Sequence, residues 1–297
     1  MEKKKAKLSL EKRHNLTGWA FLLPASILIF VFCFYPMSQA ILLSFRKTGG
    51  VFNGVANYAR IFKDKTFQQC LFNTFFYFVI QVPIMLVLAL MLAQLLNNPK
   101  IKGKGIFRTL IFLPCATSLV SYSMIFKSLF APDGVVNRVL MAIGLSSVDW
   151  FQSTWPARWV IVIALIWRWT GYNMVFYLAG LQNIEYSVYE AAKIDGCSYY
   201  QIFMKIILPL LKPALTSACI FSFMWRWDDF LGALLYVNKT EKYPVSLALK
   251  MFCDPSSSSD YGAMFAMATL SILPAVLIFF CLQRYLVEGI STSGLKG

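Results

Sequence analysis

The sequence contains few charged residues and one histidine, and these scarcities exclude several classes of protein. Asp, Glu, Lys and Arg make up 14% of the 297 residues, whereas soluble domains contain roughly 25%. The histidine is His14, and the seven cysteines form no CxxC pair, so no zinc or haem site is expected. The chain also lacks the GxxxxGK[ST] loop that holds nucleotide phosphates. It is therefore not expected to be an enzyme or to bind a cofactor itself.

Apolar residues are abundant instead, at 58% of the chain. They gather in six long runs, and a helix of about 20 apolar residues crosses the bilayer core. Helices pair every backbone N–H and C=O within the segment, as a lipid environment requires. The sequence therefore predicts an all-α membrane protein with six transmembrane helices. The expected spans are about 19–45, 71–96, 106–130, 159–181, 207–237 and 263–287.

The charged residues predict how the chain is oriented. The net charge is +14, and most basic residues lie in the tail and loops, so the positive-inside rule explains them better than nucleic-acid binding does. The first apolar run is too long for a cleaved signal peptide. We expect a cytoplasmic N-terminal tail (1–18), a six-span domain (19–287) and a cytoplasmic C-terminal tail (288–297), with both termini inside.

The cytoplasmic loop 185–209 carries unusually clear local signals. Ser187 and Glu190 have the spacing of a capping box, as do Ser198 and Gln201, and Gly196 is suited to end a helix in the left-handed conformation. These signals predict two short helices joined by a turn. Local physics leaves two interpretations open: a plain interfacial helix pair, or a rigid docking element for a cytoplasmic partner.

The run Glu-Ala-Ala-Lys-Ile-Asp-Gly at 190–196, followed by Ile-Leu-Pro at 207–209, resembles the EAA loop of ABC importer permeases. The run 283–289 is similar to the tail of the carbohydrate branch of that family, whereas Cys197 replaces a residue that is commonly smaller. The resemblance implies an importer-type permease fold in the bacterial plasma (inner) membrane. It also implies that the loop is the coupling helix, seated on an ATPase through Glu190, Ala191, Ala192, Asp195 and Gly196.

The same resemblance implies the function and the partners. The chain would import a di- or oligosaccharide by alternating access, without chemistry on the sugar. Its partners would be a second, different permease subunit, two ATPase subunits that bind ATP and Mg, an extracytoplasmic sugar-binding protein, the sugar substrate and the lipid bilayer. No nucleic-acid partner is expected.

Two spans carry polar and aromatic residues at membrane depth, where they are costly and therefore candidates for function. Sugars need aromatic faces and hydrogen-bonding groups together. The candidate substrate pathway consists of Trp167, Trp169, Tyr172, Asn173, Trp225, Trp227 and Asp229. Two structural interpretations compete with it: in one, Arg226 and Asp229 neutralise each other, and in the other, the aromatic residues mark the membrane interface.

Three alternatives remain open from the sequence. An ABC importer for glycerol phosphate or another polyol fits the arginines in the spans. A self-sufficient secondary transporter would use Asp228 and Asp229 for ion coupling, but the capped loop would then have no purpose. A membrane enzyme would need a nucleophile–base set or a metal cluster, which the residue types do not favour.

Overall fold

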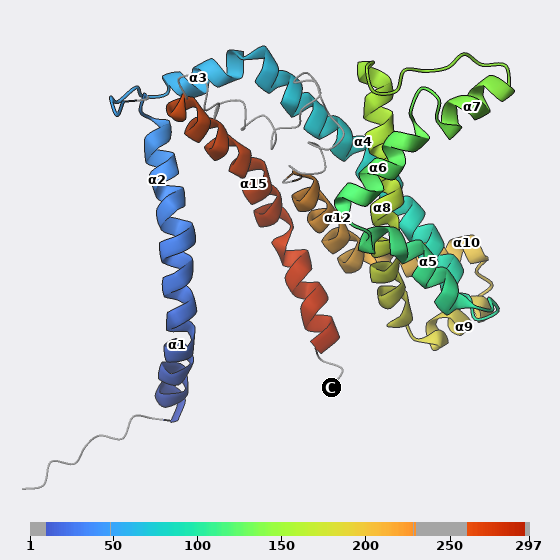
Figure 1. Ribbon diagram of the computed structural model, residues 1–297. Helices are drawn as coiled ribbons and strands as arrows, with labels where there is room; N and C mark the ends of the chain where they lie inside the picture. Colours follow the sequence, from blue (N-terminus) through green and yellow to red (C-terminus); the bar gives the residue numbers. More distant parts are fainter. Residues whose placement is uncertain (1–9, 48, 228, 230–259, 295–297) are drawn as a thin grey trace, which may run out of the picture. The chain divides into compact units, whose positions relative to one another are not determined.

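The computed structural model describes residues 10–47, 49–227, 229 and 260–294, and the regular elements in this part of the chain are helices (Figure 1). Four helices are long and apolar enough to cross a membrane, and the number rises to six if each of two bent helix pairs forms one span. The expected all-α membrane fold is confirmed. The residues divide into two compact units, Met1–Ile61 with Phe252–Leu270 and Phe62–Met251 with Ser271–Gly297.

The first span is continuous but irregular. It consists of α1 (Leu10–Ile29), a π-helical turn η1 (Phe30–Phe34) and α2 (Tyr35–Ser44). Pro36 accounts for the π turn, because its ring removes one backbone donor and crowds the carbonyl four residues earlier. The same arrangement recurs where Pro209 follows the second π turn, η2 (Phe203–Ile207).

Asn57 holds the first unit together at the end of α2. It lies in α3 (Ala56–Lys63), and its buried side-chain amide donates to the carbonyl oxygens of Ser44 and Arg46, each at 2.8 Å. The start of α15 (Tyr261–Gly294) lies on the same turn, since a Cβ on Gly262 would be 2.2 Å from the Arg46 oxygen.

The second unit is built on two long helices, α4 (Lys65–Asn97) and α8 (Thr154–Gln182), which pack along each other. Small residues let them approach: Ala89 and Ala93 are fully buried, one turn apart on α4. The helices α5 (Lys104–Ala116) and α12 (Lys212–Trp227) pack beside this pair.

The third span is bent, although the sequence predicts one span over 106–130. Its two halves are α5 and α6 (Leu119–Leu129), which meet at 96°. Thr117 between them is extended, and its carbonyl oxygen accepts a hydrogen bond from Nη1 of the buried Arg168 at 3.1 Å. A carbonyl released by the bend thus finds a partner, as the membrane interior requires.

The fifth span is also bent. The short helices α10 (Tyr199–Ile202) and α11 (Leu208–Leu210) flank η2, and α12 follows at an angle of 65° to the preceding segment. This bend lies close to Pro209 and Pro213, where the sequence predicts a turn. Beyond Trp227, Asp229 is the one residue of the expected fifth span 207–237 that the structure describes.

A single asparagine organises the connector between α6 and α8, which contains α7 (Val135–Ala142). The amide of Asn137 donates to the carbonyl oxygens of Ala131, Pro132 and Val148, and its own oxygen accepts from the Val148 N–H and the Trp150 indole. Asn137 is fully buried. The connector is therefore an ordered structure and not a free loop.

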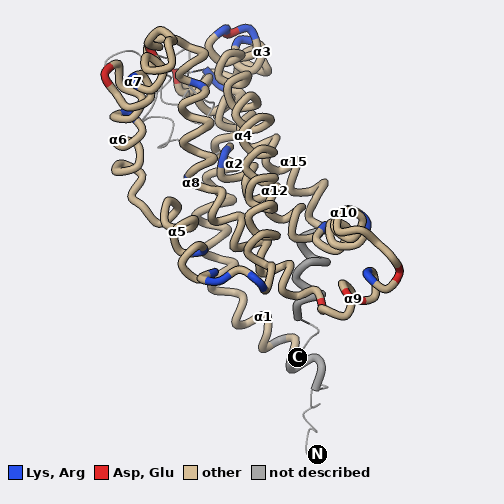
Figure 2. The backbone as a smooth tube through the Cα atoms, turned by 90° about the vertical axis from the view of Figure 1, so that its right-hand side faces the viewer, with Lys and Arg blue, Asp and Glu red and all other residues tan. Residues whose placement is uncertain are grey.

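Figure 2 shows charged positions of the second unit mainly at its two ends, near α5 and α9 (Tyr186–Ile194) at one end and near α7 at the other. The helices between are largely uncharged, as a bilayer core demands. The helix α15 continues to Gly294, so the residues from 288 to 294, expected as a separate tail, extend the last helix.

Candidate functional site

The loop expected to couple to a partner consists of α9 and α10, joined by a left-handed glycine. Gly196 has φ +78°, as expected for a residue that ends a helix. The second capping box is confirmed: the Ser198 hydroxyl accepts from the Gln201 N–H at 3.3 Å, and the Gln201 side chain accepts from the Ser198 N–H at 2.8 Å.

The prediction of a first capping box, formed by Ser187 and Glu190, is wrong. The helix α9 begins at Tyr186 with Glu185 as its N-cap, and no side chain caps it. Ser187 already lies inside the helix, so its hydroxyl does not reach the backbone donors that an N-cap residue satisfies. It donates to the Glu185 carboxylate instead, at 3.4 Å.

The two alanines of the loop point to opposite sides. Ala192 is buried in a core cluster with residues of α4, α8 and α12, whereas Ala191 is exposed. Glu190, Asp195 and Gly196 are exposed as well. Four large apolar or aromatic side chains are also exposed on the loop, at 61–86%: Tyr186, Ile194, Tyr199 and Tyr200. One face of the loop is therefore anchored in this chain and the other is open to a partner.

Tyr189 lies on the anchored side of α9. It packs against the same core cluster, and its ring stacks on Tyr186 with the centroids 6.3 Å apart. Burial raises the pKa of the Tyr189 phenol above its ordinary value, because a buried site disfavours the charged phenolate. Its hydroxyl has no hydrogen-bond partner among the described residues.

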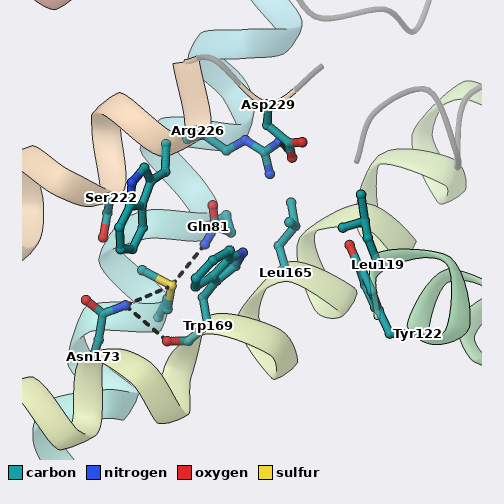
Figure 3. Close-up of a pocket in the computed structure, with 11 residues that line it drawn as sticks. Gln81, Leu119, Tyr122, Leu165, Trp169, Asn173, Ser222, Arg226 and Asp229 are labelled. Carbon is teal, nitrogen blue, oxygen red and sulfur yellow. Dashed lines mark hydrogen bonds and ion pairs between the residues drawn. The ribbon is translucent and has the colours of Figure 1, made fainter. Parts of the chain in front are cut away.

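A cavity of about 130 Å³ lies among α4, α6, α8 and α12 (Figure 3). Its residues lie at helical spacing on one face of each element, near the middle of α8. They are Gln81, Met85, Leu119, Tyr122, Leu165, Trp169, Asn173, Ser222, Trp225, Arg226 and Asp229.

The polar groups of the cavity are largely paired with each other. Arg226 forms an ion pair with Asp229, so the competing structural interpretation of this pair holds. Asn173 donates to the Trp169 carbonyl at 3.0 Å and lies 3.7 Å from the Met85 sulfur, which also accepts from Gln81 at 3.2 Å (Figure 3). The cavity therefore presents two amides, the hydroxyl groups of Tyr122 and Ser222, and a neutralised ion pair.

Three aromatic rings form a cluster at the cavity. The centroids of Trp169 and Trp225 are 5.2 Å apart, and those of Tyr172 and Trp225 are 5.1 Å apart. Tyr172 also contacts Trp169, at 6.1 Å with nearly perpendicular planes. Tyr172 does not line the cavity itself, but it supports both tryptophans that do.

The structure brings four of the seven expected pathway residues to the cavity: Trp169, Asn173, Trp225 and Asp229. Trp167 lies on another face of α8, 41% exposed and in contact with Phe126. Trp227 is buried outside the cavity, where its indole N–H donates to the Ser271 carbonyl of α15 at 2.6 Å.

Sequence reasoning missed the contribution of α4 and α6. Gln81 interrupts an apolar span, and this signal was available, since a polar residue at membrane depth is costly without a function or a partner. Tyr122 and Leu119 gave no such signal. They reach the cavity because the third span bends just before them.

The comparisons with known proteins show the family of this chain. The family model described as "Binding-protein-dependent transport system inner membrane component" matches residues 54–292. The lactose transport system permease protein LacF of Rhizobium radiobacter is 48% identical over 219 residues, which cover 72% of this chain and 74% of LacF. The probable ABC transporter permease protein YesP of Bacillus subtilis is 36% identical, over 92% of this chain and 91% of YesP.

A solved structure supports the fold. A chain of a bacterial alginate ABC transporter, crystallised with an alginate pentasaccharide-bound periplasmic protein, superimposes with a TM-score of 0.79 at 21% identity, over 92% of this chain and 95% of that chain. The family match covers most of the chain, and the helices have the expected membrane-spanning character. The chain therefore belongs to the family of multi-pass inner membrane components of binding-protein-dependent transport systems.

Proposed function

We propose that this chain is one of two permease subunits of an ATP-driven importer of a neutral di- or oligosaccharide. The cavity carries the proposal, because it combines the Trp169–Tyr172–Trp225 cluster with amide groups and an ion pair that is already neutralised. Aromatic faces pack against the C–H faces of sugars. The lactose and arabinooligosaccharide permeases among its relatives support the same substrate class.

A phosphorylated substrate is less well matched. The cationic side chain that lines the cavity, Arg226, is paired with Asp229, so a phosphate would have to displace a carboxylate.

The volume of the cavity, about 130 Å³, is smaller than the roughly 300 Å³ typical of ligand pockets. It must therefore widen to admit a sugar, as alternating access requires.

Sugar uptake by alanine variants tests the cavity. Trp169→Ala, Trp225→Ala and Asp229→Ala should each lower uptake several-fold without loss of the assembled transporter. Trp167→Ala is the matched control, because this tryptophan of the same helix lies outside the cavity. Uptake that stays normal in all three variants, or that falls equally in the control, would remove the cavity from the pathway.

We infer that the exposed face of α9 and α10 docks on a separate ATPase, which would place this loop and both termini in the cytoplasm. Ala192 and Tyr189 anchor the helix to the core of the second unit, so a pull on the exposed face would be passed to α4, α8 and α12. Such coupling needs a different contact in each state of the ATPase. The complete importer would also contain a second permease chain, a second ATPase subunit and an extracytoplasmic sugar-binding protein.

Neighbouring alanines give a matched pair for the docking test. In a chain in which alanine replaces Cys197, Ala191→Cys should crosslink to a co-expressed ATPase subunit, and the yield should depend on the nucleotide state. Ala192→Cys should not crosslink, because Ala192 is 4% exposed. No crosslink from Ala191→Cys in a transporter that still assembles and imports sugar would reduce the loop to a plain interfacial helix pair.

A further inference from the structure

Arg158 is a buried cation that forms no ion pair with a carboxylate of the described residues. It lies in the first turns of α8, at the end of the second unit opposite α9, and is 4% exposed. Its Nη2 donates to the Asn73 side-chain oxygen at 2.7 Å. Its Nε is buried without a hydrogen-bond partner, and the arginine forms no salt bridge with a described residue.

Three aromatic rings surround the guanidinium. Its central carbon lies 4.7 Å from the ring centre of Trp155, 5.3 Å from that of Phe72 and 5.6 Å from that of Phe76. Cation–π contacts of this kind offset part of the cost of burying a charge, but they leave the net positive charge in place. A buried cation is stabilised best by an anion that also accepts its remaining N–H groups.

An opening of about 630 Å³ leads to this cation. The first residues of α4 and α8 line it and bring a second cation, two hydroxyls and an amide, on Lys65, Thr66, Thr154 and Gln69. None of the described residues that line it carries a carboxylate. Asp64 caps α4, where its Oδ1 accepts from the N–H groups of Thr66 and Phe67.

The start of α8 adds to the positive character of the opening, because the first N–H groups of a helix carry a partial positive charge. Two cations, hydroxyl donors and a helix start together match a tetrahedral oxyanion such as a phosphate group.

The neighbouring surface indicates where that phosphate comes from. Phe72, Trp155 and Trp159 are 43–56% exposed around the opening, and tryptophans at a helix end are typical of the level of the lipid headgroups. We propose that the opening binds the phosphate of an anionic phospholipid, held by Arg158 and Lys65, with the acyl chains lying against the exposed aromatic side chains. This site is separate from the cavity proposed for the sugar.

Lipid binding to the complete purified transporter tests the proposal. The delipidated complex is titrated with phosphatidylglycerol or phosphatidylcholine, and bound lipid is counted by native mass spectrometry. The wild type should prefer phosphatidylglycerol. A basic residue near an anionic lipid surface contributes about 1 kcal/mol, so Lys65→Gln should weaken this binding roughly fivefold, and Arg158→Gln at least as much.

Lys127→Gln is the matched control, because Lys127 is an exposed lysine near the end of α6 that does not line the opening. The exposed Lys65 keeps the test decisive even if Arg158→Gln fails to assemble. Equal phosphatidylglycerol binding by the wild type and Lys65→Gln would overturn the proposal, as would an equal loss in Lys127→Gln. Displacement of the lipid by millimolar inorganic phosphate would assign the site to a soluble phosphate and overturn the lipid assignment.

Discussion

Gly171 lies where α8 crosses α5, and the contact leaves no room for a side chain. A Cβ at this position would be 2.0 Å from the Ile111 carbonyl oxygen and 2.9 Å from the Phe112 Cα. Both are backbone atoms, so the clash cannot be relieved by a change of rotamer. The contact to the oxygen would have to lengthen by 1.0 Å to reach the 3.0 Å below which real Cβ contacts essentially do not occur.

Two opposing terms set the effect of Gly171→Ala. Alanine is favoured over glycine inside a helix by about 1 kcal/mol, whereas overpacking of a tight contact costs about 1–3 kcal/mol. Because the clashing atoms belong to the backbone, we expect the cost to lie at the upper end of this range and the net loss in stability to be about 2 kcal/mol. Transport should fall as well, because a shift of α5 disturbs the bond between Arg168 and the Thr117 carbonyl.

The assay is thermal unfolding of the purified transporter, followed by tryptophan fluorescence, with Gly105→Ala as the control. Gly105 lies in α5 and has open space around its Cβ position, so alanine there should leave the unfolding temperature unchanged or raise it slightly. The two substitutions are chemically identical, but their effects on the unfolding temperature should have opposite signs. A Gly171→Ala variant as stable as the wild type would refute the close helix contact.

Three further predictions concern single residues. Asn137→Ala removes five hydrogen bonds of a fully buried side chain, so it should destabilise the connector by at least about 2 kcal/mol. The measurement is limited proteolysis, in which the variant should be cleaved faster than the wild type between α6 and α8. Gly196→Ala places an alanine in the left-handed conformation of this turn, which costs about 1 kcal/mol. The variant should show lower transport and lower transport-coupled ATP hydrolysis, and Gly196→Asn should show a smaller loss of both. Tyr189→Phe removes a buried hydroxyl that lacks a described partner and should leave transport and thermal stability unchanged or slightly improved. Because the raised pKa keeps the Tyr189 phenol of the wild type neutral near pH 7, the substitution should also leave the pH profile of transport unaltered near neutrality.

The long apolar runs made the membrane fold predictable, because a span is a property of local composition. The sharp turn at Gly196 and the capping box of Ser198 and Gln201 were equally predictable, since each depends on residues within one helical turn. The failure at Ser187 is instructive. The spacing of a capping box was present, but the chain leaving α8 already enters the helical conformation at Tyr186.

The bend in the third span could not be read from the sequence. Hydropathy measures how apolar residues 106–130 are, and it does not register the direction of the chain. Hydropathy likewise gives no sign that Arg168 of the fourth span binds the carbonyl of Thr117 at this bend. Trp167 and Trp169 are two residues apart, and only the packing of α8 decides that Trp169 lines the cavity while Trp167 does not.

The broken third span also sets an order of events during biogenesis. The helices α5 and α6 have 13 and 11 residues, so each is about 20 Å long or less and shorter than the bilayer core of about 30 Å. Thr117 precedes Arg168 by 51 residues, so during synthesis this segment is made before the side chain that binds the Thr117 carbonyl in the folded chain. We expect it to insert as one straight helix that bends only once α8 arrives, so the fourth span acts as an internal assembly factor for the third.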